Sequence, residues 1–71
     1  MDLRMLRFTR GLTQLHLSYL SGVSQPVISL VELGYRRPSQ DEIKKFAKAL
    51  AVKPDEINFD QEPKNGKPQA A

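Results

Sequence analysis

The chain has 71 residues, enough for one small domain with a single hydrophobic core, and we expect no separate catalytic domain. Eleven basic and eight acidic residues give a net charge of +3, and the absence of cysteine excludes disulfides and cysteine-based zinc sites. Residues 1–50 hold eight basic and four acidic residues, a charge of +4, so any attraction for a polyanion belongs to that part. Charge alone fits an ordinary solvated surface equally well.

The sequence has no apolar run of signal-peptide or membrane length, and arginines at 4, 7 and 10 interrupt its first ten residues. We therefore expect a cytoplasmic protein that has no contact with a membrane.

The first helix is predicted over residues 2–9. Its apolar residues Leu3, Leu6 and Phe8, with Met5, have near-helical spacing, and Asp2 can cap the amino end. Gly11 then permits the chain to leave the helix.

A second helix is predicted over residues 13–20, with Thr13 as its cap. Its apolar side chains are Leu15, Leu17, Tyr19 and Leu20, whereas Gln14, His16 and Ser21 are the more polar positions. Gly22 follows directly and ends the helix.

A third helix is predicted from Ser24 to Leu33, only a few residues after the second. Ser24 is a good amino-terminal cap, and Pro26 is tolerated in the first helical turn. The expected inward-facing residues are Val27, Ile28, Val31 and Leu33. Gly34 supplies a left-handed exit, and an exposed basic connector, residues 35–38, comes next.

Ser39 and Glu42 have the spacing of a capping box and mark the clearest helix start in the chain. The fourth helix is amphipathic, with an apolar face of Ile43, Phe46, Ala47 and Leu50 and a wet face of Lys44, Lys45 and Lys48.

Pro54 can open a last short helix, after which Ile57 and Phe59 close the core. We expect residues 1–60 to form the domain and residues 61–71 to form a flexible polar tail, because the tail has too few apolar residues to offset its ordering entropy. No strand-like alternation is present, so the predicted fold class is all-α, with five short helices.

The second and third helices fit a helix-turn-helix, in which the second helix of the pair lies in the major groove of DNA. This geometry requires a small residue where the helices meet, a glycine in the turn and an apolar inner face. The sequence supplies these as Ser18, Gly22, Val23, Ile28 and Val31.

The stretch GLTQLHLSYLSGVSQPVISLVELGYRRPS, residues 11–39, closely resembles the Cro/CI (XRE-like) helix-turn-helix family. Its family features are LTQ, a small residue, GVS, an I-S step, E-x-G and a basic stretch before PS. The resemblance extends from about Leu3 to Phe59. It implies a lambda-repressor-like domain of five short helices that binds double-stranded DNA.

In that family the third helix reads the DNA bases, which the resemblance carries onto Ser24 to Leu33. The implied base-reading residues are Gln25, Pro26, Ser29 and Leu30. Gln25 is the strongest of these, since an amide can both donate to and accept from adenine. Family members often have a polar or basic residue at the position of Leu30, and leucine offers only an apolar contact. Leu30 either packs on a thymine methyl group or joins Leu33 in a protein contact.

The resemblance implies backbone contacts from Gln14, Ser24, Tyr35, Arg36 and Arg37. Guanidinium groups can bind phosphate in a bidentate manner, and the tyrosine hydroxyl can add a donor. A solvent-exposed glutamine and a solvated basic loop are the alternative interpretations. Arg7 and Glu32 match a family ion pair that joins the first helix to the end of the third, and we expect this pair to be structural.

An enzyme is not expected. His16 is the single histidine and a predicted surface residue, and the neighbouring carboxylates, 41 with 42 and 55 with 56, fit the first turns of helices. No metal site, cofactor or small-molecule ligand is evident, and no aromatic stacking set on strands favours RNA.

The competing function is a protein-interaction module or antitoxin-type component that uses Leu30, Leu33 and Tyr35 as an apolar patch. As a DNA binder, so small a domain makes few base contacts. We therefore expect a homodimer on a palindromic operator, acting as a repressor of transcription.

Overall fold

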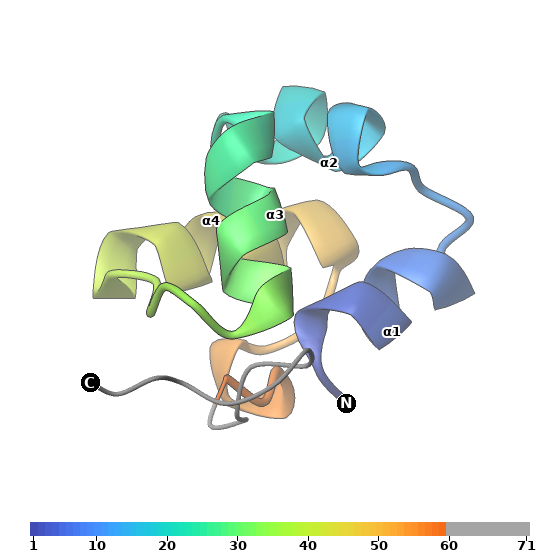
Figure 1. The fold of residues 1–71 in the computed structure, drawn as a ribbon. Helices are drawn as coiled ribbons and strands as arrows, with labels where there is room; N and C mark the ends of the chain where they lie inside the picture. The colour runs from blue at the N-terminus through green and yellow to red at the C-terminus, as the bar shows by residue number, and fades with distance from the viewer. Residues whose placement is uncertain (60–71) are drawn as a thin grey trace.

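The computed structural model describes residues 1–59, which form four α-helices and one 3-10 turn (Figure 1). The helices are α1 (Leu3–Thr9), α2 (Gln14–Ser21), α3 (Gln25–Leu33) and α4 (Gln40–Leu50), followed by η1 (Pro54–Glu56). The predicted all-α class is confirmed, and the fifth helix is this single 3-10 turn. The tail predicted over residues 61–71 lies outside the described residues.

Three of the four helices begin at the predicted capping side chains. Asp2 accepts a hydrogen bond of 2.8 Å from the amide of Met5, and Thr13 accepts one of 3.0 Å from the amide of His16. Ser39 accepts from the Glu42 amide while the Glu42 carboxylate accepts from the Ser39 amide, which completes the capping box. These bonds satisfy amide groups that have no partner inside the helix.

Ser24 occupies the cap position of α3 but its side chain makes no capping hydrogen bond, so that part of the prediction is wrong. Pro26 removes one of the two amides that a capping hydroxyl can bond, that of the second helical residue. The amide of the third residue, Val27, is still present, and it is the third-residue amide that Asp2, Thr13 and Ser39 bond, so the proline by itself does not account for the missing bond.

The helices α2, α3 and α4 are each followed directly by a left-handed residue, whereas the cap of α1, Arg10, is right-handed. Gly22 has φ 78° after α2 and Gly34 has φ 85° after α3, as the sequence indicates. Ala51 takes the same conformation after α4, with φ 60°, although a side chain makes this conformation unfavourable.

The core lies where α4 passes behind α2 and α3 (Figure 1). Its largest fully buried side chains are Leu3, Leu17, Ile28, Phe46 and Leu50. Every α-helix contributes at least one of them, so the four helices close a single core.

Not all apolar residues of the first two helices face this core. Phe8 is 54% exposed, and Leu15, Tyr19 and Leu20 are also exposed. The core-facing side of α2 consists of Gln14, Leu17, Ser18 and Ser21 instead. A helix of eight residues has only two turns, and only one side of it can meet the core.

The two ends of the described chain lie together. The amide of Asn58 donates to the Met1 carbonyl at 2.8 Å, next to an isolated bridge between Asp2 and Asn58. No strand forms within residues 1–59, and none of the helices there is long and apolar enough to cross a membrane.

Candidate nucleic-acid interface

The helices α2 and α3 meet across the short turn of residues 22–24 (Figure 1). The amide of Gly22 donates to the Ser18 carbonyl at 2.8 Å, and Val23 is buried directly after it. This turn sets α3 at a steep angle to α2, which is the arrangement of a helix-turn-helix.

One side of α3 faces the core and the other faces solvent. Ile28, Val31 and Glu32 are buried, whereas Gln25, Pro26 and Leu30 are exposed. Ser29 and Leu33 are half-buried at the edge of the exposed side. The four predicted base-reading residues therefore all lie on accessible parts of one helix.

The amino end of α3 is open to solvent. Ser24, Gln25 and Pro26 are exposed, and the Ser24 hydroxyl makes no capping bond. A helix inserted end-first into a groove presents such residues to base edges and phosphates.

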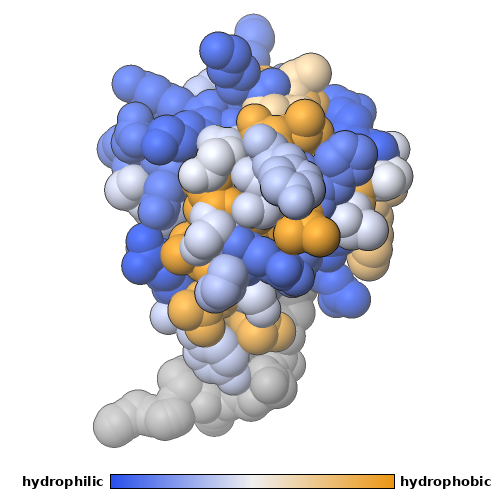
Figure 2. All heavy atoms as spheres, turned by 90° about the horizontal axis from the view of Figure 1, so that it is seen from above, coloured by the Kyte–Doolittle hydropathy of each residue, from blue (hydrophilic) through white to orange (hydrophobic). Residues whose placement is uncertain are grey.

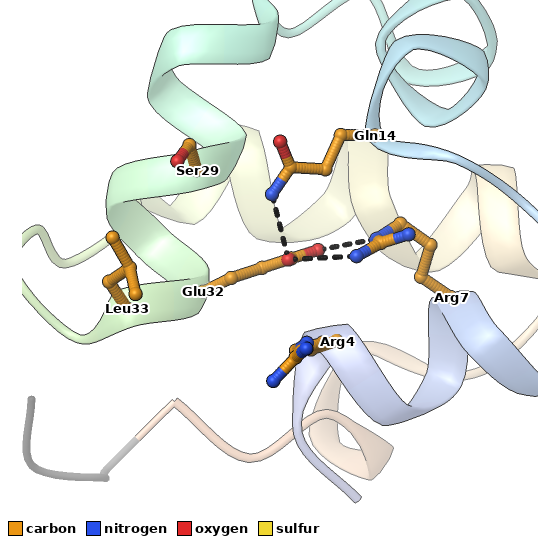
Figure 3. A pocket seen from close by; sticks show the side chains of 6 residues that line it. All are labelled: Arg4, Arg7, Gln14, Ser29, Glu32 and Leu33. Atoms are coloured by element: carbon orange, nitrogen blue, oxygen red, sulfur yellow. Dashed lines mark hydrogen bonds and ion pairs between the residues drawn. The ribbon is translucent and has the colours of Figure 1, made fainter. Parts of the chain in front are cut away.

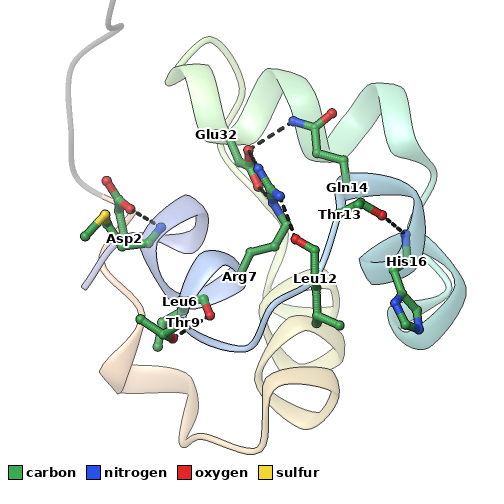
Figure 4. Close-up of polar contacts among 10 residues, drawn as sticks. Asp2, Leu6, Arg7, Thr9, Leu12, Thr13, Gln14, His16 and Glu32 are labelled. Atoms are coloured by element: carbon green, nitrogen blue, oxygen red, sulfur yellow. Dashed lines mark hydrogen bonds and ion pairs between the residues drawn. The ribbon is translucent and has the colours of Figure 1, made fainter.

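A buried ion pair fixes α3 against α1. The Nε atom of Arg7 lies 2.7 Å from Oε2 of Glu32, and its Nη2 atom lies 3.1 Å from Oε1 (Figures 3 and 4). Both residues are more than nine-tenths buried, and the bidentate geometry aligns two charge-assisted hydrogen bonds. The structure thus contains the pair that the resemblance implied.

Two further bonds extend this pair into a network across three helices (Figure 4). Gln14 Nε2 donates to Glu32 Oε1 at 3.0 Å, and Arg7 Nη1 donates to the Leu12 carbonyl at 2.8 Å. Gln14 was predicted only as a backbone contact. One of its two amide protons holds α2 to α3, and within residues 1–59 the other makes no hydrogen bond.

The basic connector after α3 is exposed, as predicted for Tyr35, Arg36 and Arg37. Arg36 has an unpredicted partner, because its Nη2 atom lies 3.0 Å from Oε2 of Glu42, the capping residue of α4. The side chain of Arg36 is 44% exposed in this pair. This pair is not evident from the sequence, because the two residues belong to different local patterns, the basic connector and the capping box.

The pKa of Glu42 lies below its ordinary value of 4.5. The largest cause is the hydrogen bond from the Ser39 backbone amide, and Arg36 and Lys45 favour the carboxylate further. Partial burial acts in the opposite direction and is outweighed. The carboxylate that caps α4 therefore stays ionised at a lower pH than an ordinary glutamate side chain.

Figure 2 shows the face that carries α2 and the start of α3, where apolar surface lies in separate patches between polar side chains. Beside α3 there is also a recess of about 280 Å³ (Figure 3). The residues that line it are Arg4, Arg7, Gln14, Ser29, Glu32 and Leu33. Sequence reasoning missed Arg4, although its spacing of three from Arg7 places both arginines on one side of α1. No cluster of potential metal ligands occurs within residues 1–59.

The chain is similar in sequence to known helix-turn-helix proteins. The helix-turn-helix family model matches residues 3–57. The chain is 44% identical over 50 residues to uncharacterised HTH-type transcriptional regulators of Mycobacterium tuberculosis, strains CDC 1551 and H37Rv. Each match covers 70% of this chain and 36% of the relative, so the chain spans about a third of the length of these relatives.

A solved structure is also similar. The restriction-modification controller protein C.AhdI from Aeromonas hydrophila superposes with a TM-score of 0.74 and 42% sequence identity. The match covers 76% of this chain and 82% of the controller protein, so the similarity extends over most of both chains.

Proposed function

We propose, from the premise that this chain belongs to the Cro/CI (XRE-like) helix-turn-helix family, that it binds specific double-stranded DNA sequences and regulates transcription. The observation that carries this proposal is the accessible side of α3, with its open amino end supported from behind by α2 and the buried Arg7–Glu32 pair. A rigid, exposed helix of this kind fits the major groove.

Base recognition is assigned to the exposed side of α3. Gln25, at the first helical position, can form two hydrogen bonds with an adenine edge. Pro26 and Ser29 lie along the same side and limit which bases fit. Leu30 is 43% exposed and offers an apolar contact suited to a thymine methyl group.

Backbone contacts are assigned to the residues that flank α3. Gln14 has one amide proton beyond its bond to Glu32, and Ser24 has a hydroxyl that is not used for capping. Tyr35 and Arg37 lie in the exposed connector. Arg36 can contact a phosphate only by sharing its guanidinium between that phosphate and Glu42.

The regulator is proposed to act as a homodimer on a palindromic operator, and to repress by covering a promoter. The basis is size, since one short recognition helix reads only a few base pairs and two copies double the contact. The cytoplasm is the proposed location, where the operator would be.

The test is selection of binding sites from random duplexes by wild-type protein, Gln25→Ala and Gln40→Ala. Gln40 is a matched control, because it is also an exposed glutamine at the first position of a helix. We expect wild type to enrich a palindromic site and Gln25→Ala to lose about 1–3 kcal/mol of discrimination at one position in each half-site. Gln40→Ala should keep the wild-type preference. Failure of the wild type to enrich any sequence would refute sequence-specific binding.

A protein-interaction or antitoxin-type role is the second candidate. The observation that favours it is that Leu30 and Tyr35 are both about half exposed, while the Tyr35 amide donates to the Leu30 carbonyl at 3.0 Å and so holds their backbones together at the end of α3. Half-buried Leu33 lies between them in sequence. If Leu33→Asp abolishes a protein complex while Arg36→Ala and Arg37→Ala leave DNA affinity unchanged, this second function replaces the first.

A further inference from the structure

The recess beside α3 lies on the side of the molecule that the proposed function turns toward DNA (Figure 3). Three of its lining residues, Ser29, Glu32 and Leu33, belong to α3. Ser29 and Leu33 lie at helical spacing from exposed Pro26 and Leu30. A duplex that follows the exposed side of α3 therefore passes over the mouth of the recess.

The lining residues leave the recess with one positive charge. Arg7 and Glu32 neutralise each other, and both Glu32 oxygens accept hydrogen bonds from Arg7 or Gln14. Arg4 supplies the remaining charge. Within residues 1–59 its guanidinium takes part in no salt bridge or hydrogen bond, and its one described contact is the ring of Phe8, 5.2 Å from the guanidinium carbon.

The exposure of Phe8 is explained by these arginines. Its ring lies 5.2 Å from the Arg4 guanidinium carbon and 4.9 Å from that of Arg7. Cations over an aromatic face are held in place without being neutralised. Phe8 is thus a positioning residue that keeps the Arg4 side chain close to the recess.

The unused donors of the recess suit a phosphate. The Arg4 guanidinium provides planar N–H groups, and the second amide proton of Gln14 and the hydroxyl of Ser29 are further donors around the same space. A phosphodiester carries one negative charge on two exposed oxygens, which matches one arginine and two neutral donors.

We propose that this recess binds one backbone phosphate of the duplex, with Arg4 as its principal ligand and with Gln14 and Ser29 as accessory donors. The proposal rests on the proposed DNA binding and adds α1 to the protein's contact surface. It fixes the distance between α3 and one DNA strand, and its Arg4 contact contributes equally to every base sequence, whereas Ser29 lies at the border between the recess and the base-reading side of α3.

The experiment measures duplex affinity by fluorescence anisotropy at several salt concentrations for wild type, Arg4→Ala and Lys48→Ala. Lys48 is an exposed residue of α4 and its loss removes the same charge away from the recess. We expect Arg4→Ala to weaken binding about tenfold for selected and unrelated duplexes alike, because one charge-assisted contact is lost. The slope of log affinity against log salt should fall by about one. Lys48→Ala should change neither quantity appreciably.

A second arm identifies the phosphate. Duplexes with a neutral methylphosphonate at successive linkages should include one position that weakens wild-type binding and leaves Arg4→Ala unaffected. Ser29→Ala should weaken binding less than Arg4→Ala, and inorganic phosphate alone should compete only at concentrations far above those of the duplex.

Each result has a defined meaning. If Arg4→Ala and Lys48→Ala are indistinguishable on a duplex that the wild type binds, or if no linkage behaves as described, the phosphate site is wrong and DNA binding stands. If inorganic phosphate competes as well as duplex, the recess is a small-anion site and the proposal is also wrong. If wild type binds no duplex at any salt concentration, the proposed function itself fails.

Discussion

Removing the positive half of the buried Arg7–Glu32 pair should be the most damaging single change to the polar interior. Arg7→Met keeps the aliphatic part of the side chain but leaves the Glu32 carboxylate, 3% exposed, with Gln14 as its donor. The Leu12 carbonyl also loses the 2.8 Å bond from Nη1. Breaking a buried pair in this way costs about 3–5 kcal/mol, because an uncompensated charge stays out of water.

This loss is large compared with the stability of the whole domain. Proteins have about 0.05–0.15 kcal/mol of stability per residue, so the 59 described residues correspond to roughly 3–9 kcal/mol. Arg7→Met should therefore use up a third or more of the stability and shift the urea midpoint accordingly. Far-UV circular dichroism during urea titration measures this shift.

Two further variants make the interpretation specific. The double variant Arg7→Met/Glu32→Leu removes both charges and should recover most of the loss, since an apolar pair is often as stable as a buried ion pair. Lys45→Met breaks the exposed pair with Asp41 and should change stability little. A loss below about 1 kcal/mol in Arg7→Met, or a double variant no more stable than the single one, would refute the reasoning.

Two smaller predictions concern α4. Ala51→Gly should stabilise the domain by about 0.5–1 kcal/mol in urea unfolding, because relief of the left-handed strain at φ 60° exceeds the added freedom of glycine in the unfolded chain. The control is Ala49→Gly within α4, which should destabilise the domain. A destabilised Ala51→Gly would contradict the strain argument. NMR titration should place the pKa of Glu42 below 4.5, and Arg36→Ala should raise that pKa only part of the way, because the Ser39 amide is the larger cause. Since the folded-state pKa is depressed, the stability that Glu42 contributes is present above pH 4.5 and is lost as pH falls through the lower folded-state value. Glu42→Gln should not show this loss of stability in acid. Equal acid sensitivity of wild type and Glu42→Gln would contradict the predicted pKa depression.

Local rules predicted the helices well, because caps and left-handed exits are encoded within a few residues. Asp2, Thr13, Ser39 and the glycines at 22 and 34 act as the sequence indicates. Ser24 shows the limit of such rules. It has the residue type and the position of a cap, yet its hydroxyl makes no capping bond, although Pro26 removes only the amide of the second helical residue.

Side-chain partners were harder to predict than helices, because they depend on how helices pack. The spacing of Phe8 is typical of a core residue, yet its side chain is exposed and its ring lies beneath the guanidinium groups of two arginines. The resemblance implied a phosphate contact for Arg36, whereas in the structure its guanidinium forms an ion pair with Glu42. No role for Arg4 was predicted from the sequence, because the recess that it lines is formed by three helices together.

The hydrogen bond between the Asn58 amide and the Met1 carbonyl holds the two ends of the described chain next to each other. Because the first and last described elements already touch, the covalent order of the helices is separable from their arrangement in space. A chain joined at that point by a short linker and opened at exposed Gly11, where an added side chain would meet no atom within 4 Å, would keep the same α2–α3 unit. The position of α3 is then set by the elements packed around it rather than by its place in the sequence.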